Sequence, residues 1–255
     1  MSDAIAYGGF VAGFPTDAEL TLPDQQAALL RHALQCLDGI TAPGDCVLGG
    51  GTALAARWHH RLSVDIDLFT SDANYRRIKP ALDRRAEQWK ADAAFSEVRI
   101  HPTVIHCHLS DGLEFSVAGS DDVTLRPLSK EREAATGVRL QSTGEIIARK
   151  IRARMINRES YVVRDAYDVV CCLEFDSQAL NEALGALTQG ERAALKYDSG
   201  SNRLTLDSNQ PLLDPIHAEF HDSEHLLKRL FEVLAGAVPK AGRQPSRSGP
   251  QGLAP

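Results

Sequence analysis

The pattern of apolar and polar residues predicts strands in the first half of the chain. In the segment "VDIDLF", Val64, Ile66 and Leu68 alternate with polar residues and would share one face of a strand. Asp65 and Asp67 would share the opposite face. The segments "CVLGGG", "EVRI", "TVIHCHL" and "LEFSVAG" are also short and apolar, and "SDG" between the last two is typical of a hairpin turn. Together these segments predict a small mixed sheet.

Helices are predicted between these strands and through most of the second half. Apolar residues three and four positions apart indicate a helix after Pro23, another in "TALAARWHH" and a third over residues 80–92. Thr52 would cap the second of these helices. Beyond about residue 125 the helical spacing dominates, and Ser142 with Glu145 would form a capping box ahead of "IIARKIRARMINR". Further helices are predicted at "RDAYDVVCCLEF" and at residues 178–196 and 222–235.

The expected fold class is α+β, with a small mixed sheet flanked by helices and a helical C-terminal subdomain. At 255 residues the chain is long enough to bury a sizeable core. The last residues are rich in Pro, Gly and Ser and lack a core pattern, which predicts disorder. The expected regions are an irregular segment and helix (1–44), a core with the sheet (45–125), the helical subdomain (126–236) and a disordered tail (237–255).

Composition and charge exclude several classes of protein. With 43% hydrophobic and 24% charged residues, the chain has the composition of an ordinary globular protein. It shows no signal peptide and no apolar run long enough to cross a bilayer, so we expect a cytoplasmic protein without a membrane partner. Five cysteines without a CxxC spacing predict reduced core thiols, and His106 and His108 lack a spacing that would enforce a structural zinc site. Because the net charge is −6, any polyanion site must be a local patch.

Three consecutive glycines, Gly49 to Gly51, precede the predicted helix of "TALAARWHH". Glycines in such a turn let backbone N–H groups approach a ligand, and the helix N-terminus adds partial positive charge, so a triphosphate could bind there. Thr52 could offer its hydroxyl to a phosphate oxygen. The alternative is a turn that binds nothing. No Gly-Lys-Ser/Thr follows, so the segment is not a P-loop.

The pair Asp65 and Asp67 is a candidate metal site. Two carboxylates on one strand face repel each other unless cations lie between them. Hard oxygen ligands on a rigid strand suit Mg²⁺, which takes one or two carboxylates and completes its shell with water and substrate phosphate. The alternative is the exposed face of an edge strand. The apolar residues around the pair instead indicate a strand inside the sheet, where unpaired carboxylates need a partner.

A third carboxylate is expected on a neighbouring strand. Glu114 lies on the face opposite Leu113 and Phe115, so an adjacent strand could bring it beside the aspartate pair. Three carboxylates could hold two metal ions about 3.5–4 Å apart, which is the arrangement that clamps both oxygens of a phosphoryl transfer. Asp111 is the rival third acid, although its place in the "SDG" turn favours a role in the hairpin.

The segment "LGGGTALAARWHHRLSVDIDLF" resembles the nucleotidyltransferase signature of the DNA polymerase β superfamily: an apolar residue, a glycine turn, a helix and then Asp-x-Asp. More closely, "GGTALA" with "HRLSVDIDLF" resembles the AbiEii/AbiGii family of nucleotidyltransferase toxins from type IV toxin–antitoxin systems. That family also carries a lysine-bearing helix, here "EIIARKIRAR", and an Arg/Lys-Asp-x-x-Asp helix start, here "RDAYDVV". The similarity spans about residues 45–175.

The resemblance implies a minimal nucleotidyltransferase fold and a set of site residues. The metal ligands would be Asp65, Asp67 and Glu114, holding two Mg²⁺ ions. The residues implied to bind the nucleotide are Gly50, Gly51, Thr52, Arg61, Lys150 and Asp165. Asp168 is a further candidate to complete the pocket, and Lys150 and Asp168 are expected to join the three carboxylates as catalytic residues.

The sequence itself adds support in the second half of the chain. Residues 130–164 contain nine Lys or Arg against four Glu, an excess of five on an acidic chain, which would suit RNA or a triphosphate. Solvated helix faces with i,i+4 ion pairs are the alternative. Lys150 lies beside apolar residues and would need an anion, whereas Asp168 is too far along its helix to serve the N-terminus as Asp165 could.

These observations predict an NTP-dependent, pyrophosphate-releasing nucleotidyltransferase that transfers an NMP to an acceptor hydroxyl. The family resemblance makes a tRNA 3′ end the favoured acceptor and a cognate antitoxin the expected partner. Two alternatives stay open from sequence: a small molecule or a protein side chain as the acceptor, and a catalytically idle nucleotide-binding scaffold.

Overall fold

The computed structural model describes residues 19–156, 160–195, 205–207 and 212–236. The predicted irregular start of the chain and its predicted disordered tail lie almost entirely outside these residues. Among the described helices, none combines the length and the apolar character that crossing a bilayer requires.

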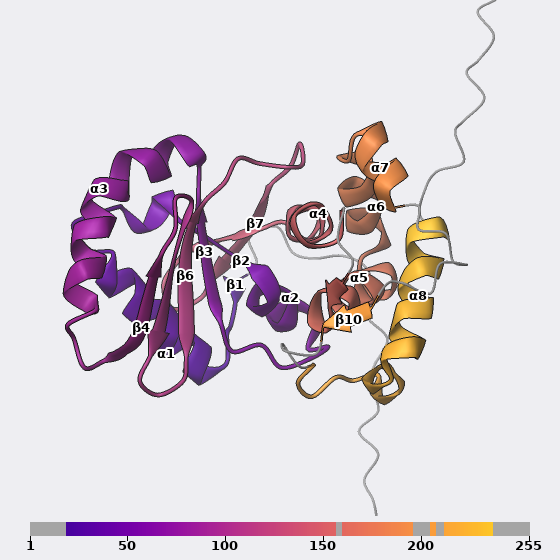
Figure 1. Ribbon diagram of the computed structural model, residues 1–255, viewed down its shortest axis with the longest axis horizontal. Helices are drawn as coiled ribbons and strands as arrows, with labels where there is room; N and C mark the ends of the chain where they lie inside the picture. Colours follow the sequence, from indigo (N-terminus) through magenta and orange to yellow (C-terminus); the bar gives the residue numbers. More distant parts are fainter. Residues whose placement is uncertain (1–18, 157–159, 196–204, 208–211, 237–255) are drawn as a thin grey trace, which may run out of the picture.

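A mixed eight-stranded sheet forms the first half of the molecule (Figure 1). Its strands, in spatial order, are β1 (Glu19–Leu20), β7 (Leu128–Glu133), β8 (Arg139–Gln141), β2 (Val47–Gly49), β3 (Ile66–Thr70), β6 (Glu114–Gly119), β5 (Val104–Leu109) and β4 (Phe95–Ile100). The central strand β3 runs antiparallel to β2 and parallel to β6. Two short strands, β9 (Ser160–Val162) and β10 (Thr205–Asp207), pair separately.

The helices fall into two groups. Those that accompany the sheet are α1 (Asp24–Cys36), α2 (Gly50–Trp58) and α3 (Asp72–Trp89). Those of the second half are α4 (Thr143–Arg154), α5 (Val163–Phe175), α6 (Ser177–Gly185), α7 (Gln189–Leu195) and α8 (Ser223–Gly236). Helices α1 and α3 contact β6 on one side of the sheet, and α2 lies between the sheet and α5 (Figure 1).

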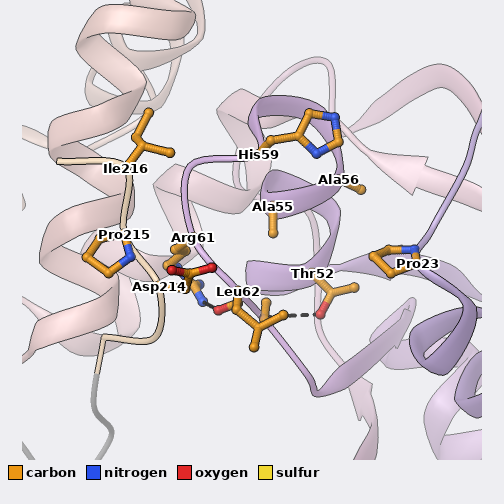
Figure 2. A pocket seen from close by; sticks show the side chains of 11 residues that line it. Pro23, Thr52, Ala55, Ala56, His59, Arg61, Leu62, Asp214, Pro215 and Ile216 are labelled. Carbon is orange, nitrogen blue, oxygen red and sulfur yellow. Dashed lines mark hydrogen bonds between the residues drawn. The ribbon is translucent and has the colours of Figure 1, made fainter. Parts of the chain in front are cut away.

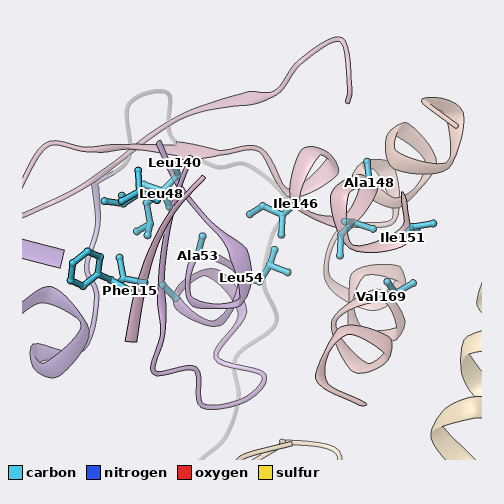
Figure 3. Packing of buried hydrophobic residues seen from close by; sticks show 14 of the residues in the cluster. Leu48, Ala53, Leu54, Phe115, Leu140, Ile146, Ala148, Ile151 and Val169 are labelled. Atoms are coloured by element: carbon cyan, nitrogen blue, oxygen red, sulfur yellow. The ribbon is translucent and has the colours of Figure 1, made fainter. Parts of the chain in front are cut away.

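One hydrophobic core extends from the sheet into the helical half. In β3, Ile66 and Leu68 are fully buried while Asp67 between them is not, as the alternating pattern predicts. Figure 3 shows the continuity of this core, with Leu54 of α2 placed between the sheet and the α4 residue Ile151. The sheet and the helices therefore stabilise each other through shared apolar burial.

The cysteines lie in the core, as the sequence predicts. All five are buried and none forms a disulfide. Burial raises the pKa of the Cys36 and Cys46 thiols to about 11, which keeps them protonated and unreactive at neutral pH.

Strands β7 and β8 lie beyond residue 125, where the sequence predicts only helices. The segment of β7, "LSKERE", has almost no apolar residues, so its strand is specified by backbone pairing with β1 and β8 and carries no hydrophobic signal. The helical spacing that begins the second half starts only at Thr143. How the chain divides into domains stays a prediction.

One predicted helix start and half of one predicted capping box differ from the structure. Helix α3 begins at Asp72, earlier than the predicted residue 80, because Ser71 caps it by accepting a hydrogen bond from the Asn74 amide at 3.1 Å. At α4, Ser142 accepts from the Glu145 amide as a capping box requires, but the Glu145 carboxylate does not return to Ser142. It accepts instead from the amide and hydroxyl of Thr124, at 2.7 and 2.8 Å.

Candidate active site

The bend between β2 and α2 places a backbone turn directly against Asp67. Helix α2 begins at Gly50, whose φ of +66° lies in the left-handed region that favours glycine. A Cβ added to Gly50 would lie only 2.1 Å from Asp67 Oδ2, and one added to Gly51 would lie 2.2 Å from Arg61 Nη2. The glycines are therefore needed because two charged side chains approach the bend closely. The predicted glycine turn into a helix is confirmed.

Thr52 has a different role from the predicted helix cap. Gly49 occupies the N-cap position of α2 without a side-chain hydrogen bond, and Thr52 lies inside the first turn, where it is buried. Its hydroxyl contacts the Asp65 carbonyl oxygen and lies 3.1 Å from Ser63 Oγ. Thr52 thus ties the start of α2 to the chain just before β3, and so positions the aspartates.

The register of β3 and β6 brings the third acid beside the pair. Ile66 is paired with Phe115 and Asp67 with Ser116 in this parallel ladder, so Asp65 and Glu114 lie at the same level one residue earlier. Ser116 is buried, and its hydroxyl donates a hydrogen bond of 2.8 Å to Asp67 Oδ1. Neighbouring residues of a parallel ladder that share a register position point to the same face of the sheet. Three carboxylates therefore line one face beside the glycine bend.

The electrostatics of Asp65 show that these carboxylates influence each other. Burial raises the pKa of Asp65, and the negative charges of Asp67 and Glu114 raise it further. Arg164 opposes this shift, since its Nη1 lies 2.9 Å from Asp65 Oδ2. Asp65 thus has one cationic partner and two anionic neighbours.

Glu114 is held by two histidines of the adjacent strand β5. His106 Nδ1 lies 3.0 Å from Glu114 Oε1, and His108 Nδ1 lies 3.4 Å from Glu114 Oε2. The hydrogen bond with His106 lowers the pKa of Glu114, against the opposing effect of burial. Asp111, the rival third acid, lies in the hairpin turn and accepts from the Leu113 amide at 3.1 Å. The structure therefore places Glu114, and not Asp111, beside the aspartate pair.

The other predicted site residues meet in a buried ion network. Asp168 is fully buried and accepts two hydrogen bonds from Arg61, with Nε at 2.7 Å and Nη2 at 2.9 Å. His60 Nε2 lies 2.7 Å from the same carboxylate. Lys150 Nζ contacts Asp165 and lies 3.1 Å from Asp168. The network therefore joins the chain after α2 to α4 and α5.

The charges of this network compensate one another. Asp168 loses solvation on burial, yet the charges of Arg61 and Lys150 hold its pKa well below the usual range. Asp165 is shifted in the same direction, since Lys150 and Arg154 outweigh its burial and lower its pKa. Both aspartates are therefore ionised, and the cations around them have partners inside the protein.

Two arginines to which the sequence analysis gave no site role face the acids. Arg154 Nη1 lies 3.1 Å from Asp165 Oδ2, and Arg164 Nη1 bonds to Asp65. The pKa of Arg154 is raised by Asp165 first and by Asp67 as well, which places its guanidinium in the field of the acids. Both side chains are partly exposed.

Comparison with known proteins decides the family. The family model described as "Nucleotidyl transferase AbiEii toxin, Type IV TA system" matches residues 33–234. The chain belongs to this family. The match confirms the resemblance inferred from sequence, and it makes the protein a nucleotidyltransferase of a toxin family from type IV toxin–antitoxin systems.

Solved structures give a more distant likeness. JHP933 from Helicobacter pylori shares 17% identity over 85% of this chain and 93% of its own, with a TM-score of 0.43. A second H. pylori structure, described as a candidate nucleotidyltransferase, has the same identity and TM-score and is covered over 96% of its length. No curated protein matches the chain. The family assignment thus rests on the sequence match.

The AbiEii-family protein offers suitable chemistry for divalent cations at the three carboxylates. Within the described residues, no group of three or more His, Cys, Asp or Glu side chains forms a ready-made metal cluster. Each carboxylate has its own partner instead: Arg164, Ser116 and His106. Their oxygens are nevertheless the hard ligands that Mg²⁺ prefers. Moreover, the raised pKa of Asp65 reflects burial and crowded negative charge, which a cation would relieve.

A cavity of about 320 Å³ lies beside α2 (Figure 2). Thr52, Ala55 and Ala56 of the helix line one side, and the segment of Asp214 and Pro215 lies across from them. None of the three carboxylates lines this cavity. Two of the residues predicted to bind the nucleotide, Thr52 and Arg61, do line it.

For some residues that contact the acids, the sequence pattern of the AbiEii-family protein already indicated a place near the site. Ser116 shares a strand face with Glu114 in the "LEFSVAG" pattern, and Arg164 directly precedes Asp165 in "RDAYDVV". The pairing of Arg61 with Asp168 had no local signal, because the two residues lie 107 positions apart. Assignments of Arg61, Lys150, Asp165 and Asp168 to the nucleotide stay predictions.

Proposed function

We propose that this AbiEii-family nucleotidyltransferase transfers a nucleoside monophosphate from an NTP to a hydroxyl of RNA, with a tRNA 3′ end as the favoured acceptor. The observation that carries the proposal is the placement of Asp65, Asp67 and Glu114 on one face of two neighbouring strands, beside the glycine bend. Such a group of carboxylates next to a glycine turn at a helix N-terminus suits phosphoryl transfer.

The proposed reaction is a single displacement at the α-phosphorus. The acceptor oxygen forms a new bond to this phosphorus, and the bond from it to the oxygen bridging to the β-phosphate breaks. Pyrophosphate leaves with the electron pair, and the hydroxyl proton passes to solvent. Catalysis comes mainly from placing the two substrates and from neutralising charge, without a covalent enzyme intermediate.

The three carboxylates are the residues that would hold two Mg²⁺ ions, and Glu114 would serve the ion on the acceptor side. When bound, the ions neutralise charge on the phosphates and lower the pKa of the acceptor hydroxyl. Ser116 fixes one oxygen of Asp67, and the triphosphate would accept hydrogen bonds from backbone N–H groups at the start of α2.

Support for RNA as the acceptor comes from a few cations on two neighbouring strands. Most of the cations between residues 130 and 164 form ion pairs in the structure, so the excess seen in sequence overstates the free charge. Within the described residues, Lys130, Arg132 and Arg139 form no ion pair with an acid, and Arg132 and Arg139 are cross-strand partners in β7 and β8. These three cations would contact a phosphate backbone. The family implies an antitoxin as a further partner.

The proposed activity is tested by incubating the protein with Mg²⁺, each labelled NTP in turn, and total RNA. Label in a tRNA band is the expected result, whereas label only in protein or in small molecules would contradict the RNA acceptor. Absence of any transfer, with every NTP and acceptor class, would favour an idle nucleotide-binding scaffold.

The metal-binding role is tested with Asp67→Ala, which should abolish transfer because it removes a carboxylate beside the bend. Asp38→Ala is the matched control, since Asp38 is exposed and far from β3 in the chain. Circular dichroism should show that both variants are folded. Undiminished transfer by Asp67→Ala would contradict the assignment.

A further inference from the structure

Two arginines of the helical half lie beside the acidic face and have N–H donors that make no ion pair. Arg154 is the last residue of α4, and Arg164 lies in the first turn of α5. Their side chains are 45% and 26% exposed, respectively. Each guanidinium has five N–H donors, yet each makes its ion pair through Nη1 alone. Both can therefore bind a further anion without leaving the protein surface.

The cations expected from sequence to bind phosphate are less available. Lys150 is only 10% exposed and lies between Asp165 and Asp168. Arg61 is buried and donates two hydrogen bonds to the Asp168 carboxylate. Withdrawing either cation would leave a buried carboxylate without its compensating charge, which is strongly unfavourable. Asp165, in contrast, keeps Lys150 as a partner if Arg154 turns to another anion.

We propose that Arg154 and Arg164 bind the triphosphate of the incoming nucleotide, and that Arg164 transfers to it from Asp65 when a divalent cation binds that carboxylate. This inference rests on the proposed function and adds to it the residues that recognise the phosphates. Arg164 serves in this way as the counter-ion of Asp65 until the metal and nucleotide arrive.

The charge distribution around Asp65 favours this exchange. Asp65 has Asp67 and Glu114 as anionic neighbours, so a divalent cation compensates its charge better than a single guanidinium does. Arg164 then loses its partner close to where the triphosphate lies. An arginine presents planar, paired donors that match phosphate oxygens, so this new contact replaces the lost one.

The first experiment measures binding of a non-hydrolysable NTP analogue in Mg²⁺ by calorimetry. Arg154→Gln and Arg164→Gln should each weaken the analogue by about tenfold or more, because each removes a charge-assisted hydrogen bond. Binding of the matching nucleoside monophosphate should change much less. Arg152→Gln is the control on the same helix, because Arg152 is 36% exposed and pairs with Glu191 at 2.8 Å.

The second experiment measures binding of Mn²⁺ alone by electron paramagnetic resonance. Arg164→Gln should tighten Mn²⁺ binding, since the competitor for Asp65 is gone, while the same variant weakens the nucleotide analogue. A purely structural role of Arg164 would weaken both. Opposite signs of the two effects are therefore the specific signature of the exchange.

The outcomes separate this inference from the proposed function. If the unmodified protein binds neither Mn²⁺ nor any NTP analogue, both proposals fail together. The other case is that the unmodified protein binds both Mn²⁺ and the analogue. If Arg154→Gln and Arg164→Gln then bind the analogue as tightly as Arg152→Gln does, only the assignment of the two arginines to the triphosphate is overturned. Unchanged or weaker Mn²⁺ binding by Arg164→Gln overturns the exchange.

Discussion

At the scale of single residues, Gly50 controls the contact between the bend and Asp67. Alanine at this position would have to adopt a φ of +66° and place its Cβ 2.1 Å from Asp67 Oδ2. Gly50→Ala should therefore displace the carboxylate and lower kcat by about 100-fold, since small misplacements at a reacting centre are costly. It should also destabilise the protein by about 1–3 kcal/mol, measured by chemical denaturation.

Gly137→Ala is the matched control for this prediction. Its φ of +69° imposes the same backbone strain, but a Cβ there meets no atom within 4 Å. It should cost stability without affecting catalysis. If both variants keep full activity, the close approach of Gly50 to Asp67 is not the constraint.

The positions of the candidate acids could be predicted from sequence, whereas their partners could not. Strand alternation places Asp65 and Asp67 on one face, and the same rule applied to "LEFSVAG" selects Glu114. The partners depend on strand register and helix docking, which no local pattern specifies. Ser116 is 49 positions from Asp67, and Arg164 is 99 positions from Asp65.

At the scale of elements, Asp168 links α5 to α4 and to the chain after α2. Asp168→Asn should lower the free energy of unfolding by about 3–5 kcal/mol, because it leaves the buried cations Arg61 and Lys150 short of negative charge. Denaturant unfolding measures this loss. Glu174→Gln is the control on the same helix, with a side chain 58% exposed, and should change stability by less than about 0.5 kcal/mol. Equal effects of the two substitutions would show that the network does not stabilise the docking.

Helices and strands were predicted correctly where one face is buried, because apolar residues then recur at regular spacing along the sequence. Strands β3 and β6 and helices α1, α4 and α5 each bury an apolar face, so their spacing is visible in the chain. Strand β7 is mostly polar and was missed for that reason. The first half of α3, "DANYRRIK", was missed although its buried residues Tyr75 and Ile78 continue the helical spacing to Leu82.

At the scale of the whole molecule, the buried network makes stability depend on pH. Burial lowers the pKa of His60 below its ordinary value of 6.5, although Asp168 opposes the shift. The unfolded chain therefore takes up a proton at His60 near pH 6.5 and the folded protein only at lower pH. Because the unfolded state then binds more protons, the free energy of unfolding should fall as the pH drops below about 6.5.

Denaturant unfolding at about pH 7.5 and about pH 5.5 measures this dependence. His60→Gln keeps a donor for Asp168 but cannot titrate, so its loss of stability between these two pH values should be smaller. An equal loss in the variant would assign the dependence to other groups. Asp168 contributes at lower pH: its depressed pKa stabilises the fold above about pH 4, and this contribution is lost as the pH falls through the folded-state pKa.

The order in which the site residues occur along the chain has a consequence for the synthesis of this AbiEii-family protein. The carboxylates at 65, 67 and 114 leave the ribosome well before Arg154 and Arg164. A growing polypeptide thus presents the acids on an incomplete sheet while the helices that face them are still untranslated. A chain that ends before Arg164 would keep the three carboxylates but lack Arg164 and the buried acids Asp165 and Asp168, so we expect such a fragment to bind the NTP more weakly than the full chain does.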